Sequence, residues 1–427
     1  MKTEFTQQLR IGRTYTDKTA PLAVPLVFWA TGSLGVLVGL WRLASVATPV
    51  LSGLVGAGPV LEAVHSFTLA GFTMVMMGAL YQLIPVLLNV PPVSATRALI
   101  HWAVYTLGLM GFLAGLATDW TWALACGGTG VVVGILLFLG NVGGRLRQST
   151  TFNVTAWFFV TALAYLFLTV IMGGFLVVRY TTGHPSFPHE VPVHMAIALG
   201  GWFGLLVSGT SYRLWAMFGL KHREPRHWFL TWLLANGAIV LWVVGLAAGI
   251  EVFRMVGWLC QAGAFLVYTA DIVAAGLGDA RTMRDPALRT LALSLAGLAA
   301  FEVLGSWAVF GQVGRLWIPA WIAYGIGWVG ISFVGFSQKI VPFMVWLHRY
   351  AHVHGKGKMP RLTDIWRPEL AYPPMIGAGL GLLCLLLSFI AWDPWLLRIG
   401  ASLEGFAWLF LLGAGVRAVA GPHRKPE

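Results

Sequence analysis

The sequence predicts an all-α integral membrane protein with twelve transmembrane helices in three pseudo-repeats of four. The first observation behind this prediction is composition, because 58% of the residues are hydrophobic and only 10% are charged. The second is that apolar stretches of about 20 residues, each long enough to cross a bilayer as a helix, recur along the chain. The third is an internal repeat. We expect one polytopic membrane domain over residues 1–427 and no separate soluble domain.

The apolar stretches define the expected spans in order. We place them at residues 21–44, 62–88, 97–117, 120–141, 153–178, 192–218, 228–249, 252–276, 288–311, 317–345, 373–392 and 399–418. Division by three gives four spans in each repeat. The approximate repeats are residues 21–141, 153–276 and 288–418.

The repeat is visible as a helical motif in the second, sixth and tenth spans. His65 and His194 head the first two copies and lie 129 positions apart, while Tyr81 and Tyr212 lie 131 positions apart. The third copy has no His. Its equivalent position, 257 after His65, holds Ile322.

Small residues form a stripe along the motif helix. In the second span, Gly71, Met74, Gly78, Tyr81 and Pro85 fall at steps of three and four residues and share one helical face. Such a face lets another backbone or a flat cofactor approach closely, which makes Tyr81 a candidate cofactor contact. The alternative is ordinary helix packing. We expect the three motif helices to surround a pseudo-three-fold axis with their glycine stripes, including Gly335 of the third copy, turned inward.

The formal net charge of +12 reflects membrane topology. Lys and Arg collect in alternate loops, and the other loops hold only Arg42, Arg179, Arg254, Arg315 and Arg398. Basic loops stay on the cytoplasmic side during insertion, so we expect both termini to be cytoplasmic in a cell inner or plasma membrane. The basic residues would then meet membrane lipids rather than nucleic acid.

Particular segments resemble a known family. The stretch HSFTLAGFTMVMMGALYQLIPVLL is similar to the second helix of short cbb-type relatives of the heme-copper oxidase catalytic subunit (subunit I). The stretch SQKIVPFMVWLHRYAHVHGKGKMPRL resembles the end of helix ten in the same group, and the NnrS family of the nitric-oxide response shares the layout. The resemblance implies three arcs of four helices around one or more hemes.

The resemblance also implies site residues. It makes His65 an axial ligand of a low-spin heme and His194 a ligand of the active-site copper, and it places Arg398 near the heme propionates. The chain departs from the family because the tenth span has no His and the seventh has only His227 at its start. A complete three-His copper site therefore cannot be assembled. We expect an iron on His65 whose other axial position is empty or filled by a non-His group, open to a small gas ligand.

Other groups offer alternative chemistry. His184, His189 and Glu190 precede His194 and form either a metal site at the mouth of the bundle or a solvated loop. His348, His352 and His354 lie in a basic stretch that favours contact with lipid over metal. The intramembrane acids are Asp271, Glu302 and Glu404. They serve either a proton route or structural hydrogen bonding.

The favoured function is a heme-binding membrane protein of respiratory electron transfer or of nitric oxide or oxygen handling. A respiratory subunit or cytochrome would be its partner, and whether the chain is an enzyme stays open. One alternative is a cofactor-free scaffold or assembly subunit. Another is a transporter of a small solute or metal ion that uses Asp271 or Glu302 in a central cavity.

Overall fold

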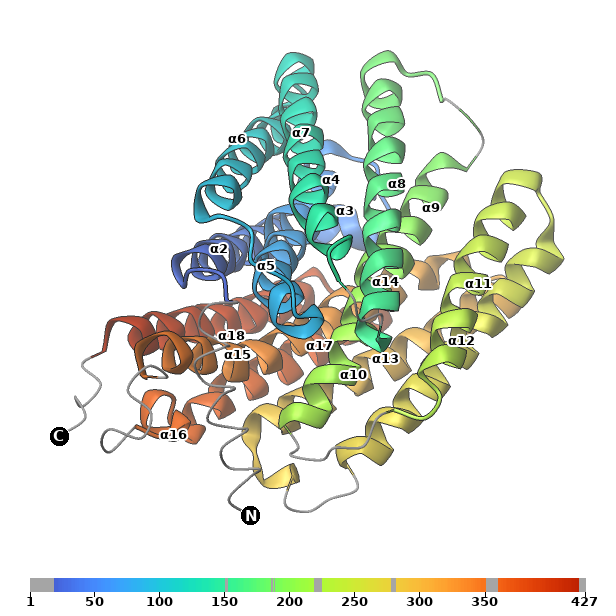
Figure 1. Ribbon diagram of the computed structural model, residues 1–427. Helices are drawn as coiled ribbons and strands as arrows, with labels where there is room; N and C mark the ends of the chain where they lie inside the picture. Colours follow the sequence, from blue (N-terminus) through green and yellow to red (C-terminus); the bar gives the residue numbers. More distant parts are fainter. Residues whose placement is uncertain are drawn as a thin grey trace.

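The structure confirms an all-helical membrane fold. The computed structural model describes residues 19–149, 153–185, 187, 189–218, 225–277, 282–350 and 360–421. Regular structure in these ranges is helical throughout and includes no strand. Twelve helical segments there are long and apolar enough to cross a membrane (Figure 1). Their bounds differ from the predicted ones by a few residues, so that the second span begins at Gly58.

An even number of spans puts both ends of the described chain on one side of the membrane. We call this side the terminal face, because α2 begins there at Ala23 and α18 ends there at Ala420. The opposite side is called the histidine face, because His65 and His194 lie near the ends of their spans that reach it.

The first four spans are built as one peripheral helix, one long central span and a hairpin. The elements are α2 (Ala23–Ser45), the short α3 (Ala47–Leu51), the central span formed by α4 (Gly58–His65), η1 (Ser66–Thr73) and α5 (Met74–Leu88), and the hairpin of α6 (Ala95–Thr118) and α7 (Thr121–Leu146).

The next four spans repeat this order. They are α8 (Val154–Thr182), then the central span of α9 (Glu190–Met195), η2 (Ala196–Gly204) and α10 (Leu205–Phe218), and then the hairpin of α11 (Trp228–Ala248) and α12 (Glu251–Ile272), which the short η3 (Val273–Leu277) extends.

The last four spans repeat it again after the short η4 (Thr282–Arg284). They are α13 (Pro286–Phe310), then the central span of η5 (Gly314–Leu316), α14 (Trp317–Ile322), η6 (Ala323–Gly330) and α15 (Ile331–Tyr350), and, after α16 (Leu362–Ile365) and η8 (Pro368–Ala371), the hairpin of α17 (Tyr372–Ala391) and α18 (Pro394–Ala420).

The three hairpins turn tightly at the histidine face. Each has a residue with positive φ directly after its first helix: Asp119 at 55°, Gly249 at 70° and Trp392 at 53°. A left-handed residue ends a helix and reverses the chain within two residues. The matching turns show that the three hairpins are the same local structure made from different sequences.

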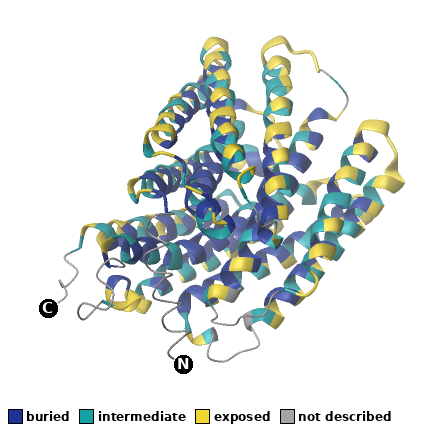
Figure 2. Ribbon diagram, in the orientation of Figure 1, coloured by how far each residue is buried: buried dark blue, intermediate teal, exposed yellow. Residues whose placement is uncertain are grey.

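The motif spans form the centre of the bundle. Within their most apolar windows, 78% of the second span, 61% of the sixth and 78% of the tenth are buried inside the protein, against 22–56% for the other nine. Figure 2 shows the same contrast between a buried interior and exposed outer helices. The predicted central position of these three spans is therefore confirmed.

The glycine stripes are buried, but they do not face the axis as we expected. A Cβ placed on Gly78 would lie 2.4 Å from the Cβ of Phe28 in α2, and one on Gly335 would lie 2.7 Å from the Cγ of Leu291 in α13. Each stripe thus packs against the first helix of its own repeat. Larger side chains occupy the axis instead, because three helices there are too far apart for glycine to fill the space.

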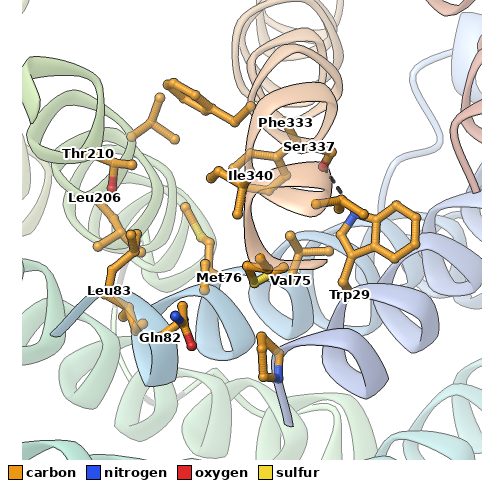
Figure 3. A pocket seen from close by; sticks show the side chains of 17 residues that line it. Trp29, Val75, Met76, Gln82, Leu83, Leu206, Thr210, Phe333, Ser337 and Ile340 are labelled. Atoms are coloured by element: carbon orange, nitrogen blue, oxygen red, sulfur yellow. Dashed lines mark hydrogen bonds between the residues drawn. The ribbon is translucent and has the colours of Figure 1, made fainter. Parts of the chain in front are cut away.

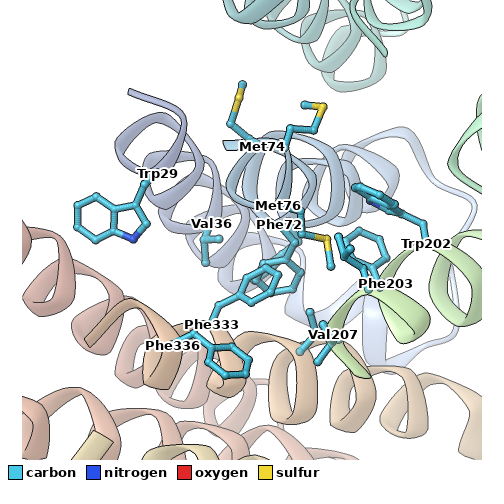
Figure 4. Close-up of a cluster of buried hydrophobic side chains, with 14 of the residues drawn as sticks. Trp29, Val36, Phe72, Met74, Met76, Trp202, Phe203, Val207, Phe333 and Phe336 are labelled. Carbon is cyan, nitrogen blue, oxygen red and sulfur yellow. The ribbon is translucent and has the colours of Figure 1, made fainter. Parts of the chain in front are cut away.

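Aromatic rings join the three central spans. The ring centroid of Phe72 lies 5.2 Å from that of Phe333 and 6.3 Å from that of Phe203, so one ring from each repeat meets at the axis (Figure 4). Just beside them, the indole Nε1 of Trp202 donates a 3.1 Å hydrogen bond to the hydroxyl of Thr73. These contacts close the middle of the bundle.

Candidate functional site

A large cavity lies between the central spans toward the histidine face. Its volume is about 1540 Å³ and its walls are mainly apolar. Its lining residues come from all three central spans and from α6, α7, α8, α11, α12 and α13. This volume exceeds the roughly 300–1,000 Å³ of common small-molecule sites, so the cavity has room for a large apolar ligand.

The three equivalent head positions of the motif all line this one cavity. They are His65 at the end of α4, His194 in α9 and Ile322 at the end of α14. The repeat therefore places two imidazoles and one aliphatic side chain around the same space. The wall from the third repeat adds the indole rings of Trp317 and Trp321, which stack with centroids 5.8 Å apart.

A π-helical segment begins within two residues after each head position. These segments are η1 after His65, η2 after His194 and η6 after Ile322. A π-turn leaves carbonyl groups without their usual partners, and such turns are frequent at functional sites. The Tyr105 hydroxyl donates a 3.1 Å hydrogen bond to the Leu69 carbonyl, and the Tyr324 hydroxyl donates a 2.7 Å hydrogen bond to the Leu199 carbonyl. Leu69 and Leu199 are 130 positions apart, so equivalent carbonyls accept in the two segments, from Tyr105 of α6 in one and from Tyr324 of η6 in the other.

Carboxylate–arginine pairs precede both histidines. The Glu62 carboxylate accepts a hydrogen bond from Nε of Arg42 in α2, with an N–O distance of 2.5 Å. The Glu190 carboxylate accepts one from Nη1 of Arg179 in α8, with an N–O distance of 3.0 Å. Both glutamates are buried, so each needs its guanidinium to offset the loss of hydration. These pairs fix the start of α4 and α9 to the preceding span. They are absent at the start of the third central span, where Pro319 stands 257 positions after Glu62.

The two imidazoles differ in their hydrogen bonding. Nδ1 of His65 lies 2.7 Å from the Leu61 carbonyl oxygen, an arrangement that places the proton on Nδ1 and leaves Nε2 as an acceptor or metal ligand. Nδ1 of His194 is buried and makes no hydrogen bond of good geometry among the described residues, although the backbone of Thr169 in α8 lies within reach of the ring. Its ring lies against α8, where Cε1 is 3.6 Å from a Cβ placed on Gly173. Both rings thus keep a nitrogen available for a ligand.

The floor of the cavity is formed by the Thr73–Trp202 hydrogen bond and the neighbouring phenylalanines. Beyond it, toward the terminal face, a second cavity of about 80 Å³ lies between the same three spans (Figure 3). Its lining is apolar except for groups such as Gln82, Thr210 and Ser337, and Ser337 accepts a hydrogen bond from Trp29. This second space is too small for a cofactor.

Tyr81 lies away from the large cavity, in a buried polar cluster of the first repeat. Its hydroxyl accepts a 3.1 Å hydrogen bond from the side-chain amide of Asn141 and lies 3.0 Å from Nδ1 of His101. His101 is 0% exposed, and its Nε2 has no partner among the described residues. The geometry therefore makes Tyr81 a partner of His101 and Asn141 rather than a lining residue of the cavity.

The second repeat contains a counterpart of this cluster. The hydroxyls of Tyr212 and Thr231 lie 2.7 Å apart, and Asp271 accepts from the backbone N–H of His227 at 3.0 Å. Thr231 and Asp271 stand 130 positions after His101 and Asn141. Asp271 lies in the last turn of α12 and caps the start of α11, not deep in its span as we expected.

Arg398 is also outside the lining of the cavity. It lies in the first turns of α18, with its guanidinium carbon 4.6 Å from the centre of the Trp395 ring. Two other arginines, Arg179 and Arg254, do line the cavity near the histidine face. The acids Asp271, Glu302 and Glu404 do not. The side chains predicted for a proton route or for transport are therefore not gathered at this cavity.

The other predicted metal groups are dispersed. Within the part of the chain that the structure describes, no three His, Cys, Asp or Glu side chains lie together as a metal site. Glu190 is paired with Arg179, His184 is exposed, and both ring nitrogens of His348 lie 2.9 Å from carbonyl oxygens, those of Met344 and Ala20. His352 and His354 fall outside the described residues.

No family model matches the chain, and no curated protein is significantly similar to it. The site must therefore be interpreted from its geometry. The residues that the sequence did not single out are His101, Asn141, Glu62 and the pair Thr73 and Trp202. A search at an offset of 130 would have paired His101 with Thr231 and Asn141 with Asp271.

Proposed function

We propose that this chain is a heme-binding membrane protein, a divergent relative of the heme-copper oxidase catalytic subunit that serves respiratory electron transfer or nitric oxide or oxygen handling. The observation that carries the proposal is a single large apolar cavity with an imidazole at two of its three equivalent wall positions. A porphyrin presents mostly apolar surface and needs a nitrogen ligand for its iron. The cavity offers both.

The ligand chemistry of the walls fits this group. His65 is the principal ligand in the proposal, because its Nδ1 is engaged by the Leu61 carbonyl and its Nε2 is free for iron. Phe67, Phe112 and Trp202 would contact the macrocycle. Arg179 and Arg254 line the same cavity, so they can meet carboxylates at the edge of a porphyrin, whereas Arg398 lies over Trp395 on α18.

When bound, an iron porphyrin supplies one-electron redox chemistry and a site for diatomic gases. The residues of this chain would bind the group and exclude bulk water from it, and His65 would hold its iron. The partner in the proposal is a respiratory subunit or cytochrome within the membrane. Lipids contact the outer helices, whose exposed residues are apolar along the spans.

A pair of histidine variants tests the proposal. The protein is expressed under heme-replete conditions, and heme per chain is measured as the pyridine hemochrome for wild type, His65→Ala and His184→Ala. His65→Ala should lose most of the heme, whereas His184→Ala, exposed and outside the cavity lining, should retain it. Equal heme in all three would refute His65 as the ligand. A folded wild-type protein without heme would favour the cofactor-free scaffold, for which Ile322 at the third head position argues.

A further inference from the structure

His65 and His194 are presented to the cavity by the same local structure. A buried glutamate that is paired with an arginine of the preceding span stands three residues before His65 and four residues before His194. A π-helical segment begins one residue after His65 and two residues after His194. In each segment a leucine carbonyl at the same repeat position, that of Leu69 or Leu199, accepts a hydrogen bond from a tyrosine hydroxyl. Because these features recur at both histidines, although the hydrogen bonds of the two rings differ, we expect the two imidazoles to do the same kind of work.

The two rings also lie at one depth in the membrane. The Thr73–Trp202 hydrogen bond joins their spans directly, and each of these residues follows its histidine by eight positions. The two imidazoles therefore lie at the same height above the floor of the cavity. A ligand placed between η1 and η2 would meet both.

The number of ligands limits the metal. Structural zinc takes four protein ligands and catalytic zinc three, and the described residues contain no cluster of three metal-binding side chains. A metal held by two imidazoles alone needs its other positions filled by another group. Iron in a porphyrin has four equatorial positions filled by the macrocycle and two axial positions left for the protein.

We propose that His65 and His194 are the two axial ligands of one heme iron, which lies between the second and sixth spans. This inference rests on the proposed function and departs from the family resemblance, which gives His194 to copper and leaves the second axial position without a histidine. His194 lines the cavity and the backbone of Thr169 in α8 lies within reach of its ring, so one ring nitrogen could keep its proton there while the other binds the iron.

The cavity has room for a group of this size. Its volume is about 1540 Å³, and its lining includes residues of α7, α8, α14 and η6 as well as both histidines. Two imidazole ligands favour a low-spin iron that transfers electrons without binding a gas, so the inference selects electron transfer over gas handling as the activity of the site.

The test is the spin state of the ferric iron in the purified full-length protein, measured by electron paramagnetic resonance with the absorption spectrum. Wild type should be low-spin. His194→Ala should retain heme through His65 but become high-spin and bind carbon monoxide when reduced, which wild type should do slowly. Added imidazole should return His194→Gly to the low-spin form. His184→Ala is the control, because His184 is exposed and outside the cavity lining, and this substitution should leave the spectrum unchanged.

The outcomes separate this inference from the proposed function. A low-spin signal that survives in His194→Ala, or a high-spin wild type, would overturn the shared iron while leaving a heme on His65. A wild type without heme would overturn both. If His194→Ala does not fold, His194→Met decides the question. A thioether in place of the second imidazole should raise the midpoint potential while His184→Ala does not, and an unchanged potential would contradict the inference.

Discussion

Trp202 of the sixth span donates a hydrogen bond of 3.1 Å to Thr73 of the second span, and both side chains are almost fully buried. The bond joins two helices at matching repeat positions and forms the floor of the cavity that His65 and His194 line. The spacing of the central spans, and with it the separation of the two imidazoles, depends on this contact.

Removing the Trp202–Thr73 bond should loosen the centre of the bundle. Trp202→Phe should lower stability by about 1–3 kcal/mol, since it leaves the Thr73 hydroxyl buried without its donor and removes part of a packed ring. Thr73→Val should cost little more in the Trp202→Phe background. A double-mutant cycle by thermal unfolding in detergent measures the coupling, and fully additive effects would show that the bond does not stabilise the fold.

The close helix contacts at the glycine stripes give a second prediction. Gly78→Ala places a Cβ 2.4 Å from Phe28, so α2 must move and stability should fall by about 1–3 kcal/mol. Gly405→Ala is the control, because a Cβ there meets nothing within 4 Å. It should leave the unfolding temperature unchanged or slightly raised. Equal effects of the two substitutions would mean that α2 and α5 do not pack as closely as described.

Tyr81 should matter for stability and not for heme. Tyr81→Phe removes the hydroxyl that lies between Asn141 and Nδ1 of His101, and it should destabilise the protein by about 1–3 kcal/mol because both partners are left unpaired. The heme content of a loaded sample should equal that of wild type. Loss of the Soret band in a folded Tyr81→Phe protein would restore the expectation that Tyr81 contacts the cofactor.

Orientation in the membrane is the fourth prediction. The basic loops should face the cytoplasm, which puts the terminal face inside and the histidine face outside. In a background without Cys126, Cys260 and Cys384, a cysteine at His184 should react with an impermeant reagent from the outside of intact cells. A cysteine at Gln148 should react only after the cells are opened. The reverse labelling pattern would invert the proposed topology.

The sequence predicted the spans and their central motif well. Apolar length determines whether a helix can cross a bilayer, and the offset of 129 to 131 between the two His and the two Tyr marks equivalent positions without knowledge of packing. The same offset placed His65 and His194 at the same depth. Those features depend on local sequence and on repetition, which a single chain displays.

Side-chain direction was harder to predict. The glycine stripe and Tyr81 were expected to face the axis, yet Gly78 packs on Phe28 and Tyr81 contacts His101 of the next span. Helical periodicity shows which residues share a face but not which neighbour that face meets. The π-helical turns after His65 and His194 also rotate each span, and nothing in the local composition marks them.

Arg398 illustrates the limit of positional resemblance. Its place between the last two spans suggested a contact with heme propionates, but the tight turn at Trp392 holds it on α18 over Trp395. Arg179 and Arg254 line the cavity instead. The tilt of the hairpins decides which loop arginine reaches the cavity, and this tilt is set by tertiary packing.

The central claim is that the cavity between the second, sixth and tenth spans holds an iron porphyrin. The measurement that tests it most directly is the absorption spectrum and iron content of the full-length protein purified after heme-replete expression. We predict a Soret band, sharp α and β bands on reduction, and about one heme per chain, as expected for one cavity with one pair of axial imidazoles. A folded, colourless protein that also fails to take up added hemin would contradict the claim and leave the chain a cofactor-free scaffold.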